Sequence, residues 1–275
     1  MNWKCLLISS RDIMKRISIL LLVPLIIMLG GCSLFRKKKN DTEQAKRPLI
    51  TEPVNQIPVS ERPYLSLSPV ENGRQIMLYL NKINKPADEA EFELEYNAGD
   101  LLRGAFGSID LVDGTGSYEV LLGSCSTGGT CSYDSDISGG TATVILRGSE
   151  NYAVKVNWRY QETSVADGKF GSQDQKIQLT GESLFAKSNY VIISEASGLP
   201  EALEGEILAG PYSVAPSNGI SASDTGTVTL RLAQESETAQ IWAWNESEWI
   251  SLETTIEGKS VSSSGEIYPL YVVTN

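Results

Sequence analysis

The chain has 275 residues, of which 41% are hydrophobic and 21% charged, a composition typical of a globular protein. Its formal net charge is −11. Because an acidic surface repels phosphates, nucleic-acid binding is excluded as the main function. The chain contains no histidine, which excludes Ser-His-Asp and Cys-His catalytic sites and removes the commonest zinc ligand.

The N-terminal segment has the features of a secretory signal. Lys15 and Arg16 precede the uncharged apolar run 17–29, and Gly30 and Gly31 follow it. These thirteen residues would rise only about 20 Å as a helix. The hydrocarbon core of a bilayer is roughly 30 Å thick, so a permanent membrane span is disfavoured.

Cys32 follows these glycines directly. The stretch 29–32, Leu-Gly-Gly-Cys, resembles the lipobox of bacterial lipoproteins. The resemblance implies that the signal peptide 1–31 is removed, that the Cys32 thiol is diacylglyceryl-modified and that the new N-terminus carries a fatty acid such as palmitate. We therefore expect a membrane-anchored extracytoplasmic protein, on the outer face of the cell membrane or on an outer membrane. The alternative is an ordinary N-terminal anchor helix with a chance cysteine.

Residues 32–63 are predicted to form a tether. A proline recurs every fifth residue from Pro48 to Pro63, and proline fixes φ and lacks an amide donor, so neither a helix nor a central strand can run through. The basic cluster 36–39 would add attraction to anionic lipid headgroups to the lipid anchor. We expect a semi-extended Pro-rich linker between the membrane and a folded head.

Residues 64–163 are predicted to form a first β-sandwich domain. Phe92, Leu94 and Tyr96 alternate with glutamates, which indicates a half-buried strand. The other expected strands are 64–70, 76–80, 108–112, 118–122, 141–147 and 152–160, separated by turns at 71–73, 113–116 and 138–140. Short strands without an amphipathic helix predict an antiparallel, immunoglobulin-like sandwich.

The polar stretch 164–174 is the predicted linker to a second β-sandwich domain, residues 175–275. The strands expected there are 177–179, 190–194, 212–214, 227–232, 240–244, 249–252, 259–262 and 270–273, with a hairpin loop at 245–248. The stretches 241–244, 249–252 and 271–273 resemble the closing strands of sandwich modules in bacterial surface proteins. The predicted fold class is therefore all-β, with two immunoglobulin-like sandwiches behind a signal peptide and a tether.

Cys125 and Cys131 are the only cysteines besides Cys32 once the leader is removed. In an oxidising compartment such a pair is expected to form a disulfide, and the glycines between them allow the necessary turn. A redox-active or metal-binding pair is the alternative. Two thiolates supply only half a zinc site, however, and the spacing is not Cys-x-x-Cys.

Asp134, Asp136 and Ser138 occupy positions one, three and five of a stretch similar to a calcium-binding loop. Position twelve, where a bidentate acid is needed, is Ile145 within a predicted strand. A solvated turn is therefore the default, with a loose calcium site as the alternative. No cofactor is expected.

Trp242, Trp244 and Trp249 are the candidate ligand platform. Trp242 and Trp244 share one face of a predicted strand, and the hairpin would bring Trp249 beside them. Such a cluster can stack against sugar rings. The alternative is that the tryptophans cap a hydrophobic core.

These features predict a lipid-anchored surface protein that binds an envelope or surface partner without catalysis, in an adhesive, structural or carbohydrate-binding role. The expected partners are membrane lipid through Cys32 and a wall glycan or another surface protein. The alternative is a glycoside hydrolase or other wall-acting lipoprotein that uses two carboxylates, since such enzymes need no histidine. A solute-binding lipoprotein is disfavoured because helices are scarce.

Overall fold

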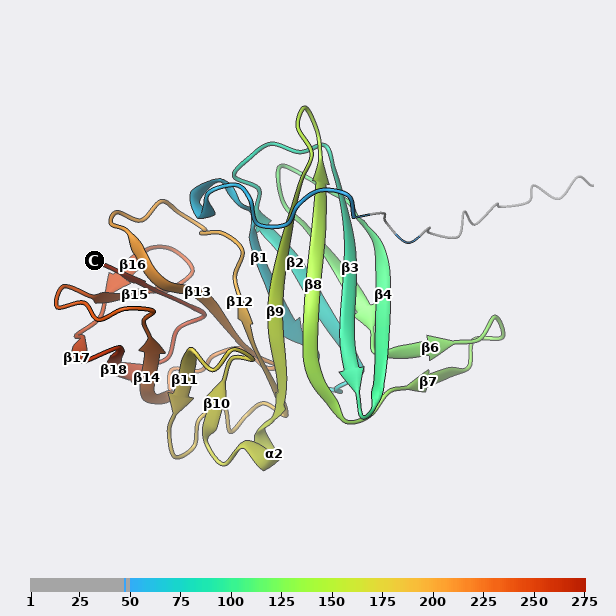
Figure 1. Ribbon diagram of the computed structural model, residues 1–275. Helices are drawn as coiled ribbons and strands as arrows, with labels where there is room; N and C mark the ends of the chain where they lie inside the picture. The colour runs from blue at the N-terminus through green and yellow to red at the C-terminus, as the bar shows by residue number, and fades with distance from the viewer. Residues whose placement is uncertain (1–46, 48–49) are drawn as a thin grey trace, which may run out of the picture. The chain divides into compact units, whose positions relative to one another are not determined.

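The computed structural model describes residues 47 and 50–275. The signal peptide 1–31, the lipidation site Cys32 and most of the predicted tether before residue 50 lie outside the described residues. The described part is almost entirely β-structure, which confirms the all-β prediction (Figure 1). None of its helices has the length and apolar character that crossing a membrane requires.

The described residues contain nineteen strands, one 3-10 helix, η1 (Val59–Glu61), and one short α-helix, α2 (Thr163–Ala166). The strands are β1 (Tyr64–Pro69), β2 (Gln75–Lys82), β3 (Glu89–Ala98), β4 (Leu101–Ile109), β5 (Gly116–Leu121), β6 (Gly123–Cys125), β7 (Cys131–Tyr133), β8 (Ile137–Arg147), β9 (Tyr152–Glu162), β10 (Lys169–Gly171), β11 (Ile177–Thr180), β12 (Tyr190–Glu195), β13 (Ile207–Pro216), β14 (Thr225–Arg231), β15 (Gln240–Trp244), β16 (Trp249–Ser251), β17 (Thr255–Glu257), β18 (Ser260–Glu266) and β19 (Leu270–Thr274).

One antiparallel sheet of nine strands runs through the body in the order β16-β15-β19-β13-β12-β9-β8-β3-β4. Its middle is the pairing of β9 with β12, in which Tyr160 lies opposite Ile192. A three-stranded sheet, β1-β2-β5, and a five-stranded sheet, β10-β11-β14-β18-β17, accompany it, and β6 and β7 form a separate hairpin (Figure 1).

The two smaller sheets cover opposite faces of the large one. Ile192 in β12 belongs to the hydrophobic core shared with the three-stranded sheet, whereas Val191 and Ile193 belong to the core shared with the five-stranded sheet. Successive side chains of a strand point to opposite faces, and all three residues are completely buried. The strand β12 therefore contributes to both cores at once.

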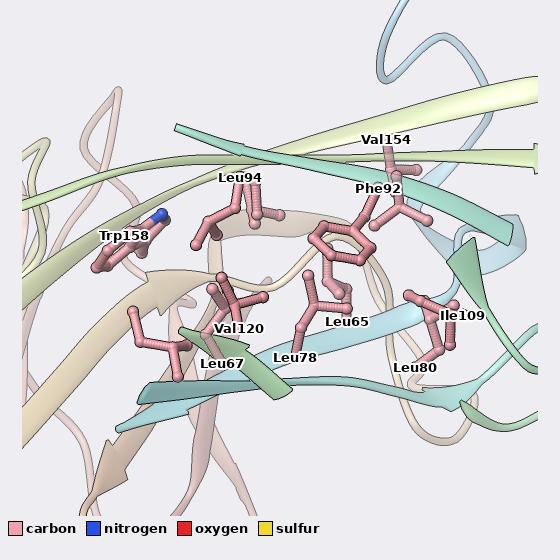
Figure 2. Packing of buried hydrophobic residues seen from close by; sticks show 14 of the residues in the cluster. Leu65, Leu67, Leu78, Leu80, Phe92, Leu94, Ile109, Val120, Val154 and Trp158 are labelled. Atoms are coloured by element: carbon pink, nitrogen blue, oxygen red, sulfur yellow. The ribbon is translucent and has the colours of Figure 1, made fainter. Parts of the chain in front are cut away.

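The first core confirms the alternation predicted for β3. Phe92 and Leu94 point toward the three-stranded sheet, where they meet Leu65 and Leu78 (Figure 2). The intervening glutamates lie on the other face of the strand, as the period of two requires.

Residues 164–174, predicted to be a linker, are structured. They contain the end of α2 and all of β10, which packs Phe170 into the second core. The pairing of β9 with β12 connects the parts of the large sheet before and after this stretch, and the described residues 47 and 50–275 belong to one compact unit. The two predicted modules correspond to two hydrophobic cores that share one sheet.

The turn predicted at residues 138–140 is wrong, because Gly139 and Gly140 lie inside β8 and pair with both β3 and β9. A Cβ atom on Gly140 would lie 1.9 Å from the carbonyl oxygen of Glu95, and Gly139 has a φ of 129°. These glycines are needed because the neighbouring backbones leave no room for a side chain.

The last part of the predicted tether, residues 50–63, is bound to the body. Val54 forms a β-bridge with Ala153 in β9. The Asn55 side chain donates to the carbonyl oxygen of Lys155 at 2.8 Å and accepts from its backbone amide at 3.0 Å. This arm crosses the face of β9 and β8 (Figure 1), so residues 50–63 belong to the folded body and are not a tether.

Candidate functional site

Two adjoining cavities lie beside β1, with volumes of about 510 and 450 Å³. They share Ser68, Ala215, Glu246 and Pro269 among their lining residues, so they lie next to each other. Lining residues come from segments 64–68, 79–82, 200–201, 213–222, 244–246 and 266–269. We call this hollow the β1 groove.

The β1 groove exists because the three-stranded sheet is narrow. Its edge strand β1 pairs with β2 on one side only, and its other side faces β12 and β13 of the large sheet. Ser213, Leu270 and Trp244 are register partners that form a row across β13, β19 and β15. Ser213 and Trp244 of this row line the groove, and Tyr64 of β1 packs against Trp244 and Leu270.

The walls of the β1 groove combine polar and apolar groups. The amide of Asn81 donates to the Ser66 hydroxyl at 2.8 Å. The Lys82 ammonium group is bound to Glu201 at 3.0 Å. Burial raises the pKa of Tyr64 to about 12, so its hydroxyl stays protonated at physiological pH. Hydroxyl, amide and carboxylate groups beside apolar surface can fix the orientation of a polar ligand.

Glu246 gives the groove an acidic rim. It lies in the 245–248 hairpin loop, which was correctly predicted, and it lines both cavities. Glu266 lines the second cavity. Neither carboxylate forms an ion pair with a described cation. The rim therefore favours neutral or positively charged ligands over acidic ones.

The structure brings Trp244 and Trp249 together as register partners with ring centroids 5.4 Å apart. Trp244 is only 8% exposed and packs in a small core with Tyr64 and Leu270. An indole buried to this extent cannot offer its face to a sugar ring. It supports the floor of the β1 groove, which agrees with the alternative that it caps a core.

Trp242 and Trp249 are half-buried and anchored by their indole nitrogens. Trp242 donates to the Thr274 hydroxyl at 3.1 Å, and Trp249 donates to the carbonyl oxygen of Glu201 at 3.2 Å. An open stacking platform of three tryptophans is therefore not formed. Only the exposed parts of the Trp242 and Trp249 rings remain accessible to a ligand.

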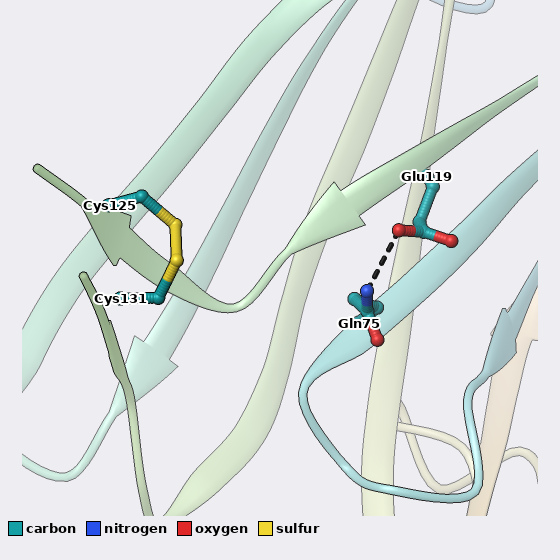
Figure 3. The surroundings of a disulfide bond; sticks show 4 residues. All are labelled: Gln75, Glu119, Cys125 and Cys131. Atoms are coloured by element: carbon teal, nitrogen blue, oxygen red, sulfur yellow. Dashed lines mark hydrogen bonds between the residues drawn. A yellow bond between two sulfur atoms is a disulfide. The ribbon is translucent and has the colours of Figure 1, made fainter. Parts of the chain in front are cut away.

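The disulfide predicted between Cys125 and Cys131 is present and joins β6 to β7 (Figure 3). These strands form a hairpin that projects from the body (Figure 1). At its base, the Gln75 amide donates to Glu119 at 2.8 Å and ties β2 to β5 (Figure 3). Neither cysteine lines the β1 groove. The disulfide closes the β6–β7 hairpin and takes no part in the candidate site.

Asp134 is occupied by protein donors. The Arg103 guanidinium donates to both of its carboxylate oxygens, the shortest contact being 2.7 Å, and the Tyr96 hydroxyl donates at 2.7 Å. Asp136 is bound by the Ser135 hydroxyl at 3.1 Å, and Ser138 lies in β8. Across residues 47 and 50–275, no group of three or more His, Cys, Asp or Glu side chains could hold a metal ion. The weak calcium site is therefore not assembled.

A pH-dependent contribution to stability is expected at Asp134. The hydrogen bond from Arg103 lowers the pKa of the Asp134 carboxyl group. A lowered folded-state pKa contributes stability above the ordinary aspartate pKa of about 3.9 and loses it as the pH falls through the folded value. We predict that Asp134→Asn destabilises the protein more at pH 7 than at pH 3, as measured by urea unfolding. Asp136→Asn is the control, and an equal effect of Asp134→Asn at both pH values would contradict the prediction.

No family model, curated protein or solved structure matches this chain. The function must therefore be inferred from the geometry of the site and the sequence alone.

The groove residues were mostly missed by sequence analysis. Ser66 and Ser68 are the outward-facing half of an alternating strand, and Ser213 and Ala215 are equally ordinary. Pro69 was the one available signal, because a proline within a sheet indicates an edge strand. It marks β1 as an edge but does not reveal which surface lies beside it.

Proposed function

We propose that this chain is a lipid-anchored extracytoplasmic protein that binds an envelope glycan in the β1 groove without catalysing its cleavage. Its body consists of two immunoglobulin-like sandwich halves that share a sheet. Membrane attachment is inferred from the lipobox ending at Cys32 and from the basic cluster 36–39. The bound polymer is neutral or carries amino groups.

The observation that carries this proposal is the adjacency of the two cavities of the β1 groove, together with the residues that line them. Two adjoining open cavities suit an extended polymer better than a small enclosed solute. Hydroxyl and amide groups of Ser66, Ser68 and Asn81 can exchange hydrogen bonds with sugar hydroxyls. The carboxylates of Glu246 and Glu266 would attract amino sugars and repel uronic acids.

Hydrolysis has less support than binding. Four described carboxyl groups have a clearly shifted pKa, namely those of Glu52, Asp134, Glu150 and Asp174, and in each case the pKa is lowered. None of the four lines the β1 groove. A glycosidase of the two-carboxylate type needs one acid whose pKa is raised.

A protein partner is the second candidate, and a specific observation favours it. The strand β4 is an edge of the large sheet. Its side chains Leu101, Leu102 and Phe106 are 60%, 69% and 38% exposed. A long edge strand with exposed apolar side chains can accept a strand from another protein.

The proposal predicts that blocking the groove abolishes glycan binding. Ser68→Trp places a bulky side chain where the two cavities meet, so we expect at least about a tenfold loss of affinity, as for other steric blocks that displace several contacts. Binding is measured by calorimetry on the purified full-length chain in mild detergent. The probes are soluble fragments of chitosan, of a neutral glucan and of polygalacturonate.

Ser108→Trp is the matched control, since Ser108 is exposed on β4 outside the groove. The control should bind like the unaltered protein, and polygalacturonate should bind least. If none of the glycans binds, or if both variants lose binding equally, the proposed function is wrong. If the chain instead captures an envelope protein, and this capture is lost when Leu102 and Phe106 are replaced, the protein-partner candidate replaces the glycan proposal.

A further inference from the structure

A separate cavity of about 300 Å³ lies on the opposite face of the large sheet, between β9, β13 and the arm 55–62. Four cationic side chains line it: Arg62, Lys155, Lys176 and Arg231. Only two acids do so, Asp174 and Glu195. The protein as a whole has a net charge of −11, so this cavity is opposite in sign to its surroundings.

The two acids already have donors of their own. Asp174 accepts a hydrogen bond from the Tyr212 hydroxyl at 2.8 Å and lies 3.6 Å from the Lys176 ammonium group. Glu195 accepts from the backbone amide and the side-chain amide of Asn157, at 3.2 and 3.0 Å. Neither acid forms an ion pair with the other three cations.

Those three cations, Arg62, Lys155 and Arg231, form no ion pair with any carboxylate in the described part of the chain. Arg62 is half-buried, and its guanidinium donates to the carbonyl oxygens of Ile57 and Asn55 at 2.8 and 2.7 Å. Burial lowers the pKa of Arg62. A partly buried cation without a counterion is unfavourable, and an anion in the cavity would relieve this.

The backbone explains why the sheet leaves room here. The pairing of β13 with β19 shifts register between Ile207 and Ala209 and again between Ala209 and Tyr212. Such irregularities bend a strand locally and are common beside binding sites. Gly210, with a φ of 85°, lies within the second irregularity, between Ala209 and Tyr212, and lines the cavity.

We propose that this cavity binds the anionic group of a small organic phosphate or carboxylate, held by Lys155, Arg231 and Arg62. The volume of about 300 Å³ exceeds that of a lone oxyanion and leaves room for the organic part of the ligand. Lys155 and Arg231 supply ammonium and guanidinium donors, and Arg62 retains donors that the two carbonyl oxygens do not use. The site is independent of the β1 groove and of the glycan proposed there.

Isothermal titration calorimetry on the full-length chain in mild detergent tests the inference. The probes are glucose 6-phosphate, glucuronate, inorganic phosphate and, as the uncharged comparison, glucose. We expect an organic anion to bind and glucose not to bind. Lys155→Gln or Arg231→Gln should weaken anion binding about tenfold or more, since each removes a charge-assisted hydrogen bond.

Lys169→Gln is the matched control, because Lys169 is exposed on β10, forms no ion pair with described residues and does not line the cavity. It should leave anion binding unchanged, as should the groove variant Ser68→Trp. A preference between glucose 6-phosphate and glucuronate identifies the anionic group. The inference is overturned if no organic anion binds at millimolar concentration, or if Lys169→Gln weakens binding as much as Lys155→Gln does.

Discussion

Replacing Phe92 by Ala in the first core, or Phe170 by Ala in the second, is expected to lower the free energy of unfolding of the whole body. Each variant should still unfold in a single transition. Phe92 is fully buried and Phe170 is 1% exposed. Truncation of a buried phenylalanine costs about 3–5 kcal/mol, because apolar contacts are lost and a cavity remains. The free energy of unfolding in urea, followed by far-UV circular dichroism and by tryptophan fluorescence, measures both variants.

A single transition follows from the position of β12. Ile192 packs in the first core and Ile193 in the second, so unfolding of either core exposes an apolar face of the strand that completes the other. Phe106→Ala, on the exposed edge strand β4, serves as the control and should change the unfolding free energy by less than about 1 kcal/mol. Two separate transitions, each sensitive to only one of the core variants, would show that the halves are independent domains.

Sequence periodicity predicted individual strands well wherever one face is buried and the other is polar. The alternation around Phe92 and Leu94 identified β3. In such a strand the alternation of apolar and polar residues follows directly from which side chains are buried. A window of a few residues is therefore enough to identify the strand.

The sharing of one sheet was not predicted, because polar residues between 164 and 174 have the composition of a linker. The informative signal was in β12, where Val191, Ile192 and Ile193 are apolar in succession. Such a run indicates a strand covered on both faces. A strand at the edge of an independent sandwich would not need both faces apolar.

The two candidate sites could not be predicted, for a related reason. Ser68 and Ala215 in the β1 groove come from segments far apart in the chain, as do Lys155 and Arg231 in the basic cavity. Serines and single cations of this kind are common on any strand or turn. Only the packing of the sheets brings them together, and no local spacing encodes that packing.

The opposite charges of the two sites give the proposed binding functions different ligands. The β1 groove carries the unpaired carboxylates of Glu246 and Glu266, whereas the cavity on the other face carries Lys155 and Arg231 without carboxylate partners. The acidic groove repels the anionic ligand of the cavity, and the cationic cavity repels a glycan that carries amino groups. Raising the ionic strength should therefore weaken anion binding in the cavity more than binding of a neutral glycan in the groove.

Replacing Cys32 by Ser is expected to abolish lipid attachment and the removal of the leader before residue 32. In the proposed lipoprotein the only covalent lipid attachment is at this sulfur and at the new N-terminus that cleavage before it creates. Each buried methylene of a lipid chain contributes about 0.8 kcal/mol to membrane binding, so the lipid chains supply most of the membrane affinity of the cleaved protein. The residues 36–39 would retain only an electrostatic attraction of about 1 kcal/mol per cation.

Fractionation of cells and mass spectrometry of the purified chain measure this effect. The unaltered protein should be found in the membrane fraction, cleaved before Cys32 and carrying lipid mass, whereas Cys32→Ser should keep its leader and gain no lipid. Cys5→Ser is the matched control, because Cys5 precedes the proposed cleavage position and should have no influence. An unaltered chain with an unmodified Cys32 and an intact leader would refute the anchoring proposal, since both the membrane location and the oxidising environment of the Cys125–Cys131 disulfide are inferred from it.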